Sequence, residues 1–315
     1  MNRLAAFALT FIASCAPVPQ DAPPSRAASF AQTLPPMRVF TTTYVAPATR
    51  PNSEIAQDFL DLSFRMESGR NVAQMTRFEG PITVRATGAT NPTMIRDLEE
   101  LLARLRTQAK LDIRMVSPDQ PASITIEAVP RAVLSAAVPK AACFVVPRLT
   151  SWREFKIARR TPQVDWTTLK RRDRAAIFVP ADVAPQEIRD CLHEELAQAL
   201  GPLNDLYRLP DSVFNDDNIQ AVLTGFDMLI LQAYYAPELR NGMSRGEAAV
   251  RIPGILARLN PAGERRAGAP LNDTSRDWIE AMETALTNGA SPARRRAAAQ
   301  QAISLGTAFG WTGVR

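Results

Sequence analysis

The spacing of apolar residues along the chain predicts several amphipathic helices. Apolar positions recur three or four residues apart over 53–67 and again over 93–110, which places them on one face of a helix. A further helix is expected from Pro185 to about Leu200, because proline favours a helix start and Gly201 can end the helix. Later helical patterns are found at 223–235, 244–259, 275–287 and 292–309.

Short apolar runs between the helices predict strands at 82–85, 112–116, 123–128, 142–146 and 175–179. The polar stretch 150–174, between the last two runs, is expected to form an inserted hairpin or loop. This order of strands and helices indicates the α+β class, with a mixed sheet packed against long helices. A linker rich in Gly, Pro, Ala and Arg at 261–270 would divide a main domain, 51–260, from a small C-terminal helical extension, 261–315.

The first fourteen residues have the pattern of a signal peptide. Arg3 supplies a positive charge, and residues 4–13 form an apolar run that is too short to span a bilayer. The run leads into Ile-Ala-Ser-Cys at 12–15, which resembles the lipobox where bacterial lipoproteins are cleaved and lipidated. We therefore expect a lipid on Cys15 to anchor the chain to a membrane. An ordinary secretory signal with a chance cysteine is the alternative.

Residues 15–50 are rich in Pro, Ala, Ser and Thr, which predicts a flexible tether between the membrane and the main domain. Ala16, rather than Asp, follows the cysteine, and this choice is compatible with sorting to the outer membrane. The expected location is therefore the periplasmic side of the cell envelope. That compartment permits disulfides, so Cys143 and Cys191 are expected to pair; two buried thiols are the alternative.

The chain contains a single histidine, His193. This excludes a histidine-rich metal site and any pair of catalytic histidines within the chain. We expect His193 to be a surface or strand-contacting residue rather than a metal ligand. The formal net charge of +5 is spread along the sequence, with no apparent basic helix that carries interleaved aromatic residues. Nucleic acid is therefore not an expected partner.

The most distinctive segment runs from 191 to 205 and reads CLHEELAQALGPLND. In a helix, Glu194 and Gln198 are four residues apart, so their side chains share a face and can converge. Gly201 permits a sharp turn that would bring Asn204 back toward that face. The spacing predicts a shaped polar cleft; a solvated helix face is the alternative.

This segment resembles the zinc-binding motif of the metzincin proteases, H-E-x-x-H-x-x-G-x-x-H. Aligned on the glycine, the resemblance places Glu194, Gln198 and Asn204 at the three histidine positions. It places Glu195 at the general base, and Asp205 directly after the third ligand position. One carboxylate and two amides are poor substitutes for imidazole at zinc, so neither a metal ion nor another cofactor is expected.

A second segment, SVFNDD at 212–217, stands where metzincins place a turn that carries a methionine, and Phe214 replaces that methionine. Together with EExxQxxGxxND and the two cysteines, it is similar to a family of bacterial lipoproteins that carry the domain of unknown function 2927. The similarity covers about 50–260 and brings no established activity. The expected binding cleft comprises Glu194, Glu195, Gln198, Asn204, Asp205, Phe214 and Asp216.

The resemblance implies an envelope lipoprotein whose metzincin-like domain is not catalytic and binds a peptide or a protein partner. Metzincin substrates pair with an edge strand, and strand addition provides affinity without chemistry. The alternative is an active hydrolase that uses Glu195 as general base with a non-standard metal site. A mainly structural domain that organises other envelope components is a third hypothesis.

Overall fold

The computed structural model describes residues 48, 50–139, 141–209, 211–215, 220–264, 273–286 and 289–308. All of them fall within one compact unit, Tyr44–Arg315. The expected signal peptide, the expected lipidation site Cys15, nearly all of the expected tether and Asp216 lie outside the described residues.

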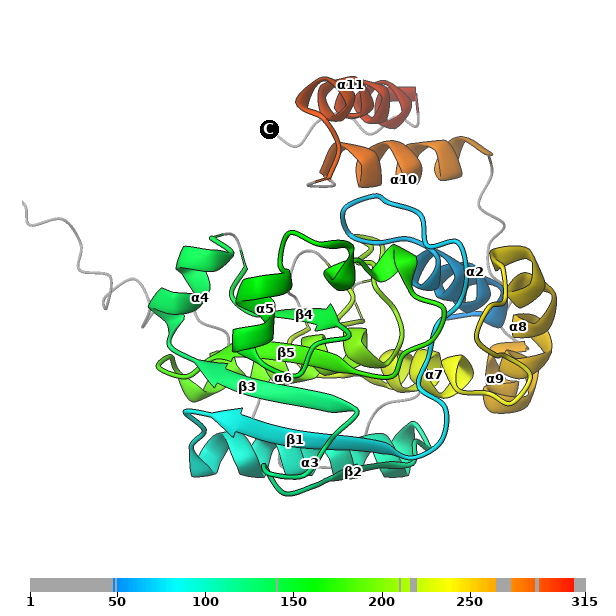
Figure 1. Cartoon of the computed structure of the whole chain (residues 1–315). Coiled ribbons are helices and arrows are strands. Elements are labelled where there is room, and N and C mark those ends of the chain that lie inside the picture. Colours follow the sequence, from blue (N-terminus) through cyan, green and yellow to red (C-terminus); the bar gives the residue numbers. More distant parts are fainter. Residues whose placement is uncertain are drawn as a thin grey trace, which may run out of the picture. The chain divides into compact units, whose positions relative to one another are not determined.

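A five-stranded mixed sheet lies at the centre of the main domain (Figure 1). Its strands are β1 (Ile82–Gly88), β2 (Ile113–Met115), β3 (Ile124–Val129), β4 (Phe144–Pro147) and β5 (Ala175–Pro180). They lie in the order β2-β1-β3-β5-β4. Neighbouring strands are parallel except β4, which runs antiparallel to β5 at one edge. Every expected strand is present, with small shifts at its ends.

Two long helices cover one face of the sheet. α3 (Pro92–Gln108) and α6 (Pro185–Leu200) bury their apolar side chains in the larger hydrophobic cluster, together with alternate positions of the strands. Asn91 caps α3 by accepting a hydrogen bond from the Met94 N–H. Each buried leucine of such a helix stabilises the fold by about 2 kcal/mol. Both helices begin at a proline, a residue that favours a helix start, and the start at Pro185 is the one the sequence predicts.

The opposite face of the sheet carries a smaller, aromatic cluster under two short helices, α4 (Arg131–Ala137) and α5 (Trp152–Ala158). Ring centroids in contact there lie between 4.9 and 6.3 Å apart; the rings belong to Phe144, Trp152, Phe155 and Phe178. Because β5 contributes to both clusters, it is buried along its whole length.

The stretch 150–174 differs from the expected hairpin or loop. It contains α5 and two short 3-10 helices, Pro162–Val164 and Trp166–Thr168. α4 was not expected either. Both α-helices span seven residues, which is too short for a convincing helical period, and their stability comes from tertiary contact with the sheet.

The remaining helices are α2 (Asn52–Ser63), α7 (Gly225–Tyr234), α8 (Arg245–Leu259), α9 (Pro261–Glu264), α10 (Asp273–Leu286) and α11 (Pro292–Ala308). The last two pack against each other and form the expected C-terminal helical segment. A mixed sheet with long helices and a helical C-terminal segment confirms the predicted α+β class. Within the described residues, no helix combines the length and the apolar character that a membrane span requires.

Candidate functional site

α6 carries three residues of the predicted site, Glu194, Glu195 and Gln198. It follows β5 in the chain and packs on α3, β4 and β5. A disulfide joins Cys143, just before β4, to Cys191 on α6, and their Cα atoms lie 5.9 Å apart. The predicted disulfide is thereby confirmed. It fixes the helix to the edge strand, and closing a loop of this length stabilises the fold by about 4 kcal/mol in the chain-entropy model.

Glu195, at the position of the expected general base, is buried inside the protein. The residue is 5% exposed, and its Oε2 atom has no hydrogen-bond partner among the described residues. Burial raises the pKa of this carboxyl well above its usual range, and the neighbouring charges of Glu194 and Glu67 raise it further. The protonated acid is therefore favoured, and a protonated carboxyl cannot accept a proton from water.

The side-chain amides of Gln198 and Asn204 both have partners within the protein. Gln198 Nε2 donates a hydrogen bond to Glu67 Oε1 over 2.7 Å. Asn204 Nδ2 donates to the backbone oxygen of Asp61, on α2, over 3.1 Å. Both residues are buried. The two amides thus bind separate protein groups on the segment 61–67 rather than one open centre.

The chain after α6 folds back toward α2, as the glycine predicts. The Leu203 N–H donates to the Leu62 oxygen and the Glu67 N–H donates to the Leu203 oxygen, each over 3.1 Å. The helix ends at Gly201. A Cβ atom on that glycine would lie only 3.1 Å from the ring of Tyr234. Close packing against this ring is therefore a second reason for glycine at this position.

A buried arginine that the sequence did not identify binds the C-terminal end of α6. Arg172 is 3% exposed. It donates hydrogen bonds of 2.5–2.6 Å to three backbone oxygens, those of Gln198, Ala199 and Gly201. Its guanidinium carbon lies 4.7 Å from the centroid of the Trp166 ring. Burial lowers the pKa of Arg172. In the described part of the chain no carboxylate pairs with it, so the negative end of the helix dipole serves as its counter-charge.

Phe214, which was expected in the cleft, lies fully buried in the core. Asp227 holds its segment in place, because Ser212 Oγ and the Val213 N–H donate to the two carboxylate oxygens over 2.5 and 3.2 Å. The same carboxylate accepts from the Thr224 N–H in a capping box at the start of α7. Burial raises the pKa of Asp227 to about 6, although these hydrogen bonds lower it. The segment therefore supports the core and does not line an open cleft.

His193 is also buried, rather than lying on the surface. Its Nδ1 atom accepts a hydrogen bond from the Leu223 N–H over 3.2 Å, so its partner is the loop before α7 and not a strand. Burial, followed by the charges of Arg104 and Arg189, lowers the pKa of this imidazole to about 3. The neutral ring serves as an internal hydrogen-bond acceptor.

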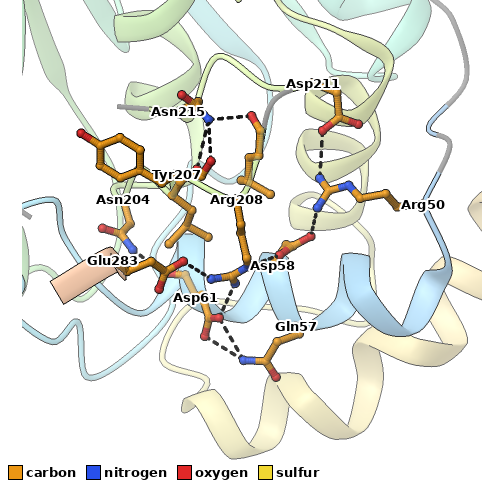
Figure 2. A network of polar contacts seen from close by, with 12 residues as sticks. Arg50, Gln57, Asp58, Asp61, Asn204, Tyr207, Arg208, Asp211, Asn215 and Glu283 are labelled. Carbon is orange, nitrogen blue, oxygen red and sulfur yellow. Dashed lines mark hydrogen bonds and ion pairs between the residues drawn. The ribbon is translucent and has the colours of Figure 1, made fainter. Parts of the chain in front are cut away.

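An ion network connects segments that are far apart in the sequence. Figure 2 shows Arg208 between the carboxylates of Asp58, Asp61 and Glu283, at N–O distances of 2.8, 2.5 and 2.5 Å. Arg50 contacts Asp58 from the other side over 2.5 Å. No local pattern identified these residues, because their partners come from α2, the loop after α6 and α10.

A small pocket lies beside this network, with a cavity volume of about 100 Å³. It is lined by the turn 65–69, by 204–207, by residues of α10, by the turn before α11 and by Arg294 of α11. Asn204 and Asp205 reach this pocket, whereas the three predicted residues of α6 do not line it.

The chemistry around the middle of α6 is acidic. Glu67, from the turn after α2, joins Glu194, Glu195 and Gln198 there, although no sequence pattern connected it to α6. Within the described residues, no group of three or more His, Cys, Asp or Glu side chains has an arrangement that could hold a metal ion.

Comparison with known proteins assigns the chain to a family. No curated protein and no solved structure matches it. A family model with the description "Protein of unknown function (DUF2927)" matches residues 52–254, well over half of the chain. The matched region contains the whole sheet, the disulfide, α6 and α7. The chain therefore belongs to the DUF2927 family.

Proposed function

We propose that this protein is a bacterial envelope lipoprotein whose main domain is a non-catalytic relative of the metzincin proteases and binds a peptide or a segment of a partner protein. One observation carries the proposal. At two of the positions that hold zinc in those proteases, the buried amides of Gln198 and Asn204 donate hydrogen bonds within the protein. A metal ion would have to displace these contacts.

The state of Glu195 supports the same proposal. A general base must be ionised and within reach of water, whereas this carboxyl is buried and its protonated form is favoured. Phe214 is buried as part of the hydrophobic core. In this proposal, side chains of the protein itself occupy the centre of the expected site.

The expected binding element is the edge strand β4. Only β5 pairs with it among the described strands, so its other side is available for an extended peptide to add as a further strand. The disulfide at Cys143 and the packing of α6 hold this edge in one conformation. A fixed edge lowers the entropy that a peptide-binding surface loses on association.

Two assays separate binding from hydrolysis. A peptide library is incubated with the full chain and with Glu195→Gln, with and without zinc, calcium and magnesium. We expect no cleavage by either protein. In the second assay, peptides that the immobilised chain retains are added to the protein, and we expect them to slow hydrogen exchange in β4. Cleavage by the wild-type chain that Glu195→Gln abolishes would establish the hydrolase instead. Peptide binding that leaves the rate of hydrogen exchange in β4 unchanged would refute strand addition.

The lipid anchor is tested separately in cells. Labelled palmitate is supplied to bacteria that express the full chain or its Cys15→Ser variant. We expect label in the wild-type chain and none in the variant, because Cys15 is the only cysteine outside the disulfide. An unlabelled wild-type chain in the soluble fraction would exclude the anchor and leave the peptide-binding proposal standing.

A further inference from the structure

Positive charge is concentrated in one part of the chain. The stretch 148–174 contains nine basic and three acidic residues, a net charge of +6, whereas the whole chain has a net charge of +5. The remainder of the sequence is therefore slightly acidic, and the expectation of an evenly spread charge is wrong. This stretch connects β4 to β5 and contains α5.

α5 has one buried side and one side exposed to solvent. Trp152, Phe155 and Ala158 are buried in the aromatic cluster on the sheet. The exposed side presents Arg153, Lys156 and Ile157, at helical spacing, followed by Arg159 and Arg160. Ile157 is 77% exposed in the middle of these cations. We refer to these five exposed residues, 153, 156, 157, 159 and 160, as the basic face of α5.

The cations of the basic face have no counter-charges among the described residues. Within the described part of the chain, no carboxylate forms an ion pair with any of its four basic residues. The acidic residues of the stretch have other partners. Glu154 accepts hydrogen bonds from Thr150, and the carboxylates of Asp165 and Asp173 pair with arginines outside the face.

The basic face is also held rigidly. Ser151 caps α5 by accepting a hydrogen bond from the Glu154 N–H. The Trp152 N–H donates to a carboxylate oxygen of Glu127 on β3 over 2.7 Å. The aromatic residues of α5 point into the protein, so the exposed side offers cations and one aliphatic side chain but no ring on which a nucleobase could stack.

We propose that the basic face of α5 docks on an anionic lipid surface. Unpaired Arg and Lys side chains complement lipid phosphates, and an exposed isoleucine among them can enter the boundary between headgroups and acyl chains. The inference rests on the proposed lipid anchor, which would keep the domain close to a bilayer at a high effective concentration. The basic face would then orient the domain and set which side of β4 faces away from the membrane.

The experiment compares two exposed positions on the same chain. Ile157→Cys and, as the matched control, Val250→Cys on α8 (81% exposed) are labelled with a polarity-sensitive dye in the full chain. Each is reconstituted in vesicles of phosphatidylcholine, with or without phosphatidylglycerol. We expect a blue shift at 157 in the anionic vesicles alone, loss of the shift in high salt, and no shift at 250. Charge reversal by Arg153→Glu, Lys156→Glu and Arg160→Glu should remove the shift.

Each other outcome contradicts the proposal in a recognisable way. An unchanged dye at 157 in anionic vesicles, or equal shifts at 157 and 250, would exclude docking through α5. A response at 157 to soluble polyglutamate but not to lipid would assign the face to an acidic protein. A chain that fails to co-sediment with neutral vesicles lacks the lipid anchor. The same dye comparison is then made with Cys15→Ser versions of the two labelled chains added from solution, so that the dye reports on position 157 or 250 alone and the two failures remain distinct.

Discussion

Single buried polar residues determine much of the structure around α6. Arg172 and Glu195 are both more than nine-tenths buried, and neither is paired with an opposite charge among the described residues. The arginine is satisfied by the carbonyl oxygens at the end of the helix. The glutamate is satisfied best as a neutral acid. Each solution follows from the high cost of an unpaired charge in a medium of low dielectric constant.

Replacement of Arg172 by Met should lower the free energy of unfolding by about 3 kcal/mol, because the variant leaves three buried carbonyl oxygens without donors. Arg171→Met is the matched control. That neighbour is exposed, and its one ion pair among the described residues is with Asp173, so its loss should cost less than about 0.5 kcal/mol. Urea denaturation monitored by tryptophan fluorescence measures both. Equal effects of the two substitutions would contradict the role of Arg172.

The raised pKa of Glu195 predicts a pH dependence of stability. The folded state holds this proton more tightly than the unfolded chain, whose glutamates titrate near 4.5. The stability contributed by Glu195 is therefore present below 4.5 and is lost progressively as the pH rises from there to the folded pKa. The side chain in Glu195→Gln is neutral at every pH. As the pH rises, the free energy of unfolding of this variant should therefore fall less steeply than that of the wild type. Parallel curves in urea titrations at several pH values would refute this assignment.

At the scale of elements, the end of α6 depends on the space that its glycine leaves free. Gly201→Ala would place a Cβ about 3.1 Å from the ring of Tyr234, which is itself buried and donates a hydrogen bond to the Thr76 oxygen. We expect a loss of about 1–3 kcal/mol in the free energy of unfolding. Gly254→Ala, in α8 with no atom within 4 Å of the new methyl group, should instead raise it by roughly 0.5–1 kcal/mol.

Thermal and urea denaturation of the two alanine variants provide the comparison. If Gly201→Ala is as stable as Gly254→Ala, the tight contact between the end of α6 and α7 is not a constraint on the sequence. A crystal structure of Gly201→Ala should otherwise show the ring of Tyr234 displaced.

At the scale of the whole molecule, the ion network of Figure 2 connects the main domain to the C-terminal helices. Arg208 contacts α2 through Asp58 and Asp61, and it contacts α10 through Glu283. The cation is partly buried, with a side-chain exposure of 20%, so these pairs are screened less than surface pairs. The network therefore stabilises the association of α10 with the body of the protein.

Glu283→Gln should loosen this association. We expect amide hydrogen exchange in α10 to accelerate about fivefold, which corresponds to about 1 kcal/mol, while exchange in the sheet stays unchanged. Glu280→Gln is the control, since Glu280 lines the same pocket and forms no ion pair among the described residues. Equal protection of α10 in the wild type and in Glu283→Gln would show that packing alone holds the helix.

The sequence by itself determined the elements whose information is local. Apolar periodicity, Pro185 at a helix start and Gly201 predicted α3, α6, α7, α8, α10 and α11, and short apolar runs predicted the five strands of the sheet. The short helix α9 was missed, because it lies in the stretch 261–270 that was expected to be a linker. The pairing of Cys143 with Cys191 followed from the cysteine count and the expected compartment. The similarity of the EExxQxxGxxND segment to its family could also be recognised from the sequence, because a motif is a local pattern.

Only the tertiary structure decided which groups meet. It brought Glu67 to Gln198, placed Arg172 at the end of α6, buried Phe214 and His193, and stabilised α5 on an aromatic cluster. Each of these contacts joins residues that are distant in the chain. Their free energies depend on burial and on the partner, quantities that a local pattern of residues does not contain.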